Sequence, residues 1–444
     1  MKTTLTAALA LLATGAIASA APTLNTPTFN KDVLPVLQAN CQGCHRPGEV
    51  APMSFMSYES TRPWAKAIKA SVLAKKMPPW FADQRYGHWS NSPRISAGQI
   101  QMLAAWADGG APEGNAKDRP APVSFPEGWQ IKPDAVVQMP EPFTIPATGV
   151  LELPSIIIPG FDKDTWVTSI EVRPSNPAVV HHLVMSLRPH NPKLAYGAQP
   201  VKPKERDAEG AAIQRVTREE DSKRVGDGSF TGLETVWVPG TPPLDFRPFQ
   251  AAKLIPAGYD IVLGMHYTPN GKATTDQTRV GFTVASEPPT RRFVTESPTT
   301  PHDEDRFRIP ANEANWETET SVVFNADTEL VWFMPHMHLR GKDMIYTLTF
   351  PTGESQTVLA VPHYDFDWQY GYYAEKPINV PKGTRLTAVA HYDNSANNKF
   401  NPNPNRDVYW GDQTWEEMMV PWFGVIVPRD TDPKKIVTYV PGVR

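Results

Sequence analysis

A chain of 444 residues is long enough for roughly two to four domains. The formal net charge is −4 and no basic stripe runs along the sequence, which argues against nucleic acid as a partner. Proline and glycine, with 47 and 28 residues, indicate many loops but stay below the share that is typical of disordered chains.

Residues 1–20 have the pattern of a secretory signal peptide. Lys2 precedes a short apolar run, and Ala18-Ser19-Ala20 fits the small-residue cleavage site. The apolar run is too short to cross a bilayer, and no later stretch is long and apolar enough to do so. We therefore expect a periplasmic or secreted protein without a membrane span.

The only two cysteines, Cys41 and Cys44, stand with His45 in the Cys-x-x-Cys-His spacing that attaches c-type haem. In such a site both thiols add to the haem, and the adjacent imidazole binds the iron. A disulfide redox pair and half of a zinc site are the alternatives. Zinc would need further Cys or His residues nearby, and a redox pair would not need the histidine. Haem c is the favoured interpretation.

The haem motif lies in residues 21–115, for which we expect a small all-α domain. Residues 29–39 read as a helix that leads into the motif, and Ser96 with Gln99 predicts a capping box for a later helix. Met77, on a proline-rich segment, is the expected second axial ligand of the iron. Met53 and Met56 are rivals, but they follow His45 so closely that core packing is the favoured role. The motif and Met77-Pro78-Pro79-Trp80 together resemble bacterial class I-like cytochrome c domains that are fused to enzymes.

After a proline-rich linker at 116–133, the pattern changes to short β-strands. We expect two sandwiches, at residues 134–290 and 291–444, separated by a proline-rich stretch at 286–300. A charged segment at 204–227 reads as a solvated loop. The expected strands of the two sandwiches lie at 155–158, 166–172, 179–187, 259–267, 279–285, 321–324, 329–333, 344–350, 386–391 and 422–427.

Five of the eleven histidines occur in a pattern that favours metal binding. His336 and His338 are two residues apart, so a strand would place both on one face. His181 and His182 are adjacent and would point to opposite faces, unless the strand ends or bulges there. His266 is expected at the end of another strand. Imidazole ligands in an oxidising compartment suit copper.

This ordered set resembles the type II ascorbate-dependent copper monooxygenases, the family of peptidylglycine α-hydroxylating and dopamine β-monooxygenases. The resemblance covers about residues 150–430 and implies two jelly-roll-like sandwiches with one copper ion each. It assigns the first copper to His181, His182 and His266. It assigns the second, which would react with oxygen, to His336, His338 and Met418, because Met418 follows two acidic residues as the family's copper methionine does.

The chain departs from the peptide-processing members of that family at three positions. Met334 stands where they carry an arginine that holds a substrate carboxylate, and Val420 and Trp422 replace a polar pair. These changes argue against a peptide substrate and favour a small, less polar organic molecule.

The resulting hypothesis is a copper monooxygenase that hydroxylates a C–H bond with O2. The reaction needs two electrons, which two copper ions can store, and we expect the fused haem to supply them from an external electron donor. The alternative is an electron-transfer or copper-binding protein without oxygenase activity. A cytochrome-linked dehydrogenase is disfavoured because we find no nucleotide or quinone motif.

Overall fold

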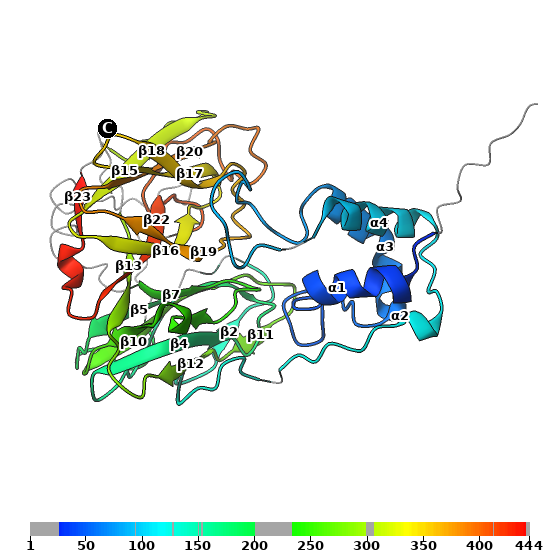
Figure 1. Cartoon of the computed structure of the whole chain (residues 1–444), viewed down its shortest axis with the longest axis horizontal. Coiled ribbons are helices and arrows are strands. Elements are labelled where there is room, and N and C mark those ends of the chain that lie inside the picture. Colours follow the sequence, from blue (N-terminus) through cyan, green and yellow to red (C-terminus); the bar gives the residue numbers. More distant parts are fainter. Residues whose placement is uncertain are drawn as a thin grey trace, which may run out of the picture.

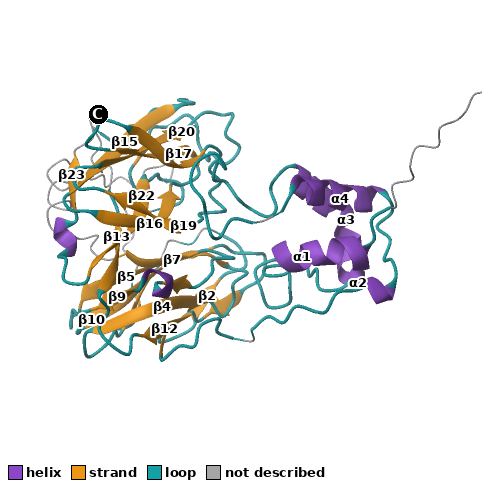
Figure 2. Ribbon diagram, in the orientation of Figure 1, coloured by secondary structure: helices purple, strands orange, loops and turns teal. Residues whose placement is uncertain are grey.

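The structure is a computed structural model that describes residues 26–440, except 94, 127, 150, 152–153, 200–232, 299–305 and 412. The expected signal peptide at 1–20 and the whole expected charged loop at 204–227 therefore lie outside the described residues. Figures 1 and 2 show a small helical part set beside a larger part made of β-sheets. Among the described helices, none has the length and apolar character needed to cross a membrane.

The helical part is built from four short α-helices around a small apolar core. They are α1 (Leu34–Asn40), α2 (Tyr58–Thr61), α3 (Ala65–Leu73) and α4 (Ala97–Asp108), and a π-helical turn, Phe29–Val33, precedes α1. The predicted capping box is present: the Ser96 hydroxyl accepts from the Gln99 N–H at 3.2 Å, and the Gln99 side chain accepts from the Ser96 N–H at 2.8 Å. Phe29, Leu37, Leu103 and Trp106 form the buried centre.

The first half of the β part contains two larger sheets and the small antiparallel pair of β2 and β11. One sheet has the order β6-β3-β10-β5-β7, and the strands β1-β12-β4-β9 belong to the other. The strands of this first half are β1 (Ala135–Gln138), β2 (Phe143–Ile145), β3 (Ser155–Ile158), β4 (Thr165–Arg173), β5 (Val180–Pro189), β6 (Gly197–Ala198), β7 (Leu233–Trp237), β8 (Leu244–Asp245), β9 (Ala251–Ile255), β10 (Tyr259–Tyr267), β11 (Thr274–Asp276) and β12 (Arg279–Val284).

The second half repeats this arrangement. The sheet β18-β17-β20-β15-β23 packs on the strands β13-β22-β16-β19, as shown by the Phe333–Tyr346 and Phe324–Phe423 ring contacts at 5.3 and 5.8 Å. Its strands are β13 (Arg291–Glu296), β14 (Arg308–Ile309), β15 (Trp316–Phe324), β16 (Thr328–His336), β17 (Gly341–Thr349), β18 (Ser355–Val361), β19 (Tyr372–Val380), β20 (Arg385–Tyr392), β21 (Val408–Tyr409), β22 (Val420–Pro428) and β23 (Val437–Val440).

The stretch at 286–300 is not merely a separator, which corrects the expectation from sequence. It contains β13, which pairs antiparallel with β22 and parallel with β9. The two sandwiches therefore share one continuous sheet of nine strands. The prolines on either side of this strand made the stretch look like a linker. The strand itself gives little local sequence signal, because its partners β22 and β9 are distant in the sequence.

Residues 80–91 also differ from expectation, because they leave the helical core and run along the second sandwich. The Asp83 N–H donates to the Ala360 carbonyl at 2.8 Å. The Trp89 ring packs edge-on against Phe333, with centroids 5.8 Å apart. Since Trp89 is buried in the core of the β part, this segment fastens the helical part to the second sandwich.

Candidate haem-attachment site and metal centre

The haem motif continues the helical path of α1. The N–H groups of Cys44 and His45 both donate to the carbonyl of Cys41, at 3.1 and 2.9 Å. Positions i, i+3 and i+4 of a helical turn share one face, so the two thiols and the imidazole are presented together. Both cysteines are free thiols.

Burial keeps these groups neutral. It raises the pKa of Cys41 to about 12 and also raises the pKa of Cys44. A redox-active Cys-x-x-Cys pair needs an accessible thiolate, so these shifts disfavour that alternative. His45 stacks on Phe55 with ring centroids 4.2 Å apart, and burial lowers its pKa. Its Nδ1 atom is buried without a hydrogen-bond partner in the part of the chain that the structure describes. The donor set thus fits haem c.

The methionines near this motif occupy different environments. Met77 follows α3 and is partly buried, and its N–H donates to the Ser71 carbonyl at 3.4 Å. Met53 packs against the helical core, whereas Met56 is 37% exposed. Exposure makes Met56 a poor ligand candidate, and axial ligation by Met77 stays a prediction.

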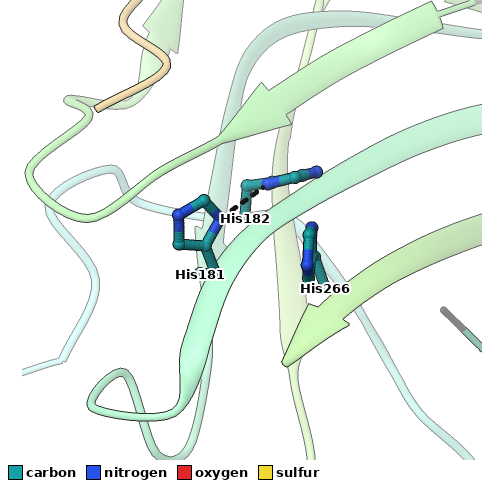
Figure 3. A group of neighbouring side chains, drawn as sticks. All are labelled: His181, His182 and His266. Atoms are coloured by element: carbon teal, nitrogen blue, oxygen red, sulfur yellow. Dashed lines mark hydrogen bonds between the residues drawn. The ribbon is translucent and has the colours of Figure 1, made fainter. Parts of the chain in front are cut away.

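The structure brings His181, His182 and His266 together at the ends of β5 and β10 (Figure 3). His182 pairs with His266 in the ladder, but Tyr267 pairs with Val180, so His181 is the extra residue of a bulge. This is the irregularity that adjacent histidines need to reach one ion. The Nδ1 atoms of His181 and His182 are 3.0 Å apart, and the three residues offer ligand atoms within 4.8 Å of one another.

His181, His182 and His266 form the first group, and the neutral state of two of these side chains suits the binding of a cation. Burial lowers the pKa of His182 and His266, so both imidazoles are neutral near pH 7. The Nε2 atom of His266 is 2.9 Å from the Thr414 hydroxyl, while its Nδ1 atom is buried without a partner among the described residues. An unpartnered nitrogen beside two further imidazole nitrogens is an arrangement that a bound metal ion would satisfy.

His336 and His338 form the second group, at the end of β16 and just beyond it. Their ring centroids are 5.2 Å apart and both side chains are buried. The Nδ1 atom of His336 is hydrogen-bonded to the side-chain oxygen of Gln369, and that of His338 to the Glu416 carbonyl at 3.1 Å. Because these oxygens can only accept, each Nδ1 carries a hydrogen and each Nε2 has a free lone pair. Burial lowers the pKa of His336 to about 3 and that of His338 to about 4.

The two histidine groups adjoin each other, although they come from different sandwiches. The rings of His182 and His336 have centroids 6.0 Å apart. The five imidazoles therefore surround one region between the sandwiches. Neutral, buried imidazoles with free nitrogen atoms are the ligands that copper and zinc prefer.

Met418 lies beside the second group, and the contacts that place it involve its backbone. Its N–H donates to Glu417 at 3.3 Å, and the Tyr392 hydroxyl donates to its carbonyl at 2.7 Å. The same Glu417 carboxylate accepts from the His338 N–H at 2.9 Å and from the Arg340 N–H at 2.6 Å. One buried carboxylate thus connects Met418 to His338, while ligation by the Met418 thioether stays a prediction.

Apolar side chains also lie around the second group. Trp422 contacts His336 at 5.1 Å between ring centroids, and it pairs in register with Met334. Met334, Val420 and Trp422 are all buried. His391 has a different role, because its two nitrogens contact Asp343 and Glu317 at 2.7 and 3.1 Å.

Sequence reasoning missed the loop at 364–371, which contacts both histidine groups. Phe366 stacks on His181 with centroids 4.7 Å apart, and Gln369 binds His336. The density of aromatic residues from Tyr364 to Tyr373 was the available signal. It did not reveal where the loop would lie.

Comparisons with known proteins add little to this geometry. No protein-family model matches the chain, and no curated protein sequence matches it. One similar solved structure is "Structure of infectious bursal disease virus Gt strain", which is 8% identical, with 72% of this chain and 77% of that chain covered and a TM-score of 0.18. The corresponding Gx strain structure is 7% identical, with 72% and 78% covered and a TM-score of 0.17. Scores this low carry no argument about fold or function.

Proposed function

We propose that the chain is an exported, haem c-linked copper monooxygenase that hydroxylates a C–H bond of a small organic substrate with O2. In this proposal the helical part is a cytochrome c domain, and the sandwiches are the jelly-roll-like domains of a type II copper monooxygenase. The observation that carries the proposal is the convergence of His181, His182, His266, His336 and His338 from two sandwiches.

The residues fit the groups that the proposal requires. Copper would supply one-electron redox chemistry and a place for O2, and haem c would supply a store for one further electron. His181, His182 and His266 would hold one copper ion, and His336, His338 and Met418 the other. Cys41, Cys44 and His45 would hold the haem, with Met77 as the second axial ligand.

The protein groups around the second site have two tasks. Gln369 and the Glu416 carbonyl hold the His336 and His338 rings by their Nδ1 atoms, which keeps each Nε2 available. Met334, Val420 and Trp422 present buried apolar surface and no charge. This environment favours a weakly polar substrate over a peptide with a free carboxylate.

The decisive experiment is oxygen uptake by the reduced, copper-loaded protein across a panel of small aromatic and aliphatic compounds. The expected result is uptake that depends on one class of compound, with one atom of labelled O2 in the product. If the haem reduces copper but no compound is hydroxylated, the chain is an electron-transfer or copper-binding protein instead. A periplasmic or secreted location and an external electron donor belong to the same proposal.

A further inference from the structure

Residues 364–371, in the loop between β18 and β19, lie near the haem motif and contact both histidine groups. The loop is short and closely folded. The Trp368 N–H donates to the Asp365 carbonyl, and the Tyr370 N–H donates to the Trp368 carbonyl, both at 3.0 Å. These two hydrogen bonds form turns that fix the two ends of the loop relative to each other.

One end of the loop lies beside the haem motif. A Cβ atom placed on Gly240 would lie 3.3 Å from the Cys44 sulfur and 3.2 Å from the Tyr370 hydroxyl. Both groups therefore border the same small space at the turn after β7. Tyr370 in turn stacks on Trp368, with ring centroids 6.1 Å apart and planes within 10° of parallel.

The other end lies against the imidazoles. Phe366 stacks on His181 with ring planes 19° apart, and the Asp367 carboxylate is 3.7 Å from the His181 Nε2 atom. Gln369 connects the two ends, because its amide oxygen binds His336 and its NH2 group donates to the Phe366 carbonyl at 3.3 Å. The loop thus leads from Cys44 to His181 and His336 through its covalent chain, with the Tyr370–Trp368 ring contact at one end and the Phe366–His181 ring contact at the other.

We propose that residues 366–370 are the electron-transfer bridge between the haem and the first copper site. This inference rests on the proposed function and adds the route that electrons take from the haem to the copper. Electron tunnelling weakens steeply across empty or water-filled gaps and less across bonded and packed atoms, so the short covalent chain and the ring contacts at its two ends favour transfer along this path. In each passage one electron leaves ferrous haem, which becomes ferric, and reduces cupric copper to cuprous copper. Two passages supply one hydroxylation, and an external one-electron donor reloads the haem.

Trp368 is the residue to test, because it joins Tyr370 to the part of the loop that touches the metal ligands. The full-length protein, loaded with haem and copper, is oxidised under anaerobic conditions, and its haem is then reduced by a brief photochemical pulse. The absorbance of the haem reports its reoxidation, and the paramagnetic signal of cupric copper reports the acceptor. Copper content, haem potential and melting temperature are measured on every variant.

We expect copper-dependent reoxidation in the wild type at a rate that is independent of protein concentration. Trp368→Leu should slow it by about tenfold or more, equivalent to roughly 1.4 kcal/mol in the activation free energy. Trp368→Phe should retain most of the rate because a ring remains. Trp64→Leu, the same change at a 40% exposed tryptophan of the helical part, is the matched control and should transfer at the wild-type rate.

Wild-type transfer in Trp368→Leu would overturn the bridge, as would the absence of copper-dependent reoxidation in the wild type. If Trp368→Leu loses haem or copper, Tyr370→Leu provides the same comparison from the other end of the stacked pair. Hydroxylation with an unaffected Trp368→Leu rate would leave the proposed function standing without the bridge. A slowed rate in a protein that hydroxylates nothing would support the bridge and refute the monooxygenase.

Discussion

His182 and His266 lie opposite each other in the β5–β10 ladder, with ring centroids 4.5 Å apart, and the ladder shifts by one residue directly beside them. The shift leaves His181 without a ladder partner in β10 and brings its Nδ1 atom to 3.0 Å from that of His182. The candidate first metal site therefore depends on a β-bulge as well as on three imidazoles. Bulges often redirect side chains next to functional sites.

Copper loading tests the cluster directly. We expect two copper ions per chain, one of which is lost in His266→Ala and the other in the double variant His336→Ala/His338→Ala. Burial keeps the imidazoles neutral, so protons should compete little with the metal near pH 7. Elemental analysis after dialysis gives the stoichiometry. Zinc alone, or a copper content unchanged in the double variant, would refute the assignment.

Thr414 should tune the first site without binding the metal. Its hydroxyl lies 2.9 Å from the Nε2 atom of His266, and this contact holds the ring while its Nδ1 atom is buried without a partner among the described residues. Loss of such a supporting hydrogen bond typically weakens metal binding by about 10- to 100-fold. We expect that loss in Thr414→Val and near-normal affinity in Thr414→Ser, measured by competition with a chelator. Equal affinities in the two variants would show that the contact is incidental.

The haem assignment predicts covalent attachment and a thioether ligand. Haem should stay with the denatured wild-type chain and should be released from Cys41→Ala/Cys44→Ala. Met77→Ala should remove the weak long-wavelength absorption of ferric iron bound to a thioether, while the control Met53→Ala should keep it. Persistence of this band in Met77→Ala would exclude Met77 as the ligand.

Glu296 is expected to make the free energy of unfolding depend on pH. It accepts a hydrogen bond from the Tyr439 hydroxyl at 3.1 Å, and burial raises its pKa from 4.5 to about 7. The folded state then binds the proton more tightly than the unfolded state. The stabilisation is complete below pH 4.5 and is lost as the pH rises to about 7, by at most roughly 1.4 kcal/mol per pH unit.

Glu296→Gln removes this titration and isolates its effect. The wild type should lose stability relative to the variant between pH 4.5 and about 7, as measured by denaturant unfolding of the full chain. Burial lowers the pKa of the nearby Lys253 to about 7, so its own effect lies at higher pH and has the opposite sign. Parallel stability curves for the two proteins in the lower window would contradict the assignment.

Local signals were sufficient to predict many of the elements. The capping box of α4 and the bounds of β3 and β10 match expectation, because a cap depends on two nearby side chains and a strand on a short apolar run. β13 was missed because its stability depends on β22 and β9, which are distant in sequence.

The residues of the candidate site likewise fall into those that the sequence identified and those that it did not. Residue type and spacing pointed to the histidines, and the need for a bulge at His181 followed from strand geometry. The loop that carries Phe366 and Gln369 could not be placed, because its position depends on tertiary packing between the sandwiches. Thr414 was missed for the same reason, since its partner His266 lies 148 residues away in the chain.

Met418 is the position at which oxygen chemistry and packing can be separated. Its backbone is tied to Glu417, which also holds the backbone of His338, so its side chain begins close to the second histidine group. A core methionine that is shortened to alanine typically costs roughly 2–5 kcal/mol of stability. Met418→His keeps the volume and a donor atom, so we expect little change in melting temperature, intact haem reduction and loss of substrate-dependent oxygen uptake.

The adjacent Met419 provides the control for this substitution, because it is fully buried and belongs to the apolar core. Met419→Leu keeps the apolar volume and should therefore retain oxygen uptake, at a stability cost below about 1.5 kcal/mol. Oxygen uptake and melting temperature are measured on both variants with copper content held equal. Full turnover by Met418→His would remove the thioether from the second site, and with it much of the support for a monooxygenase.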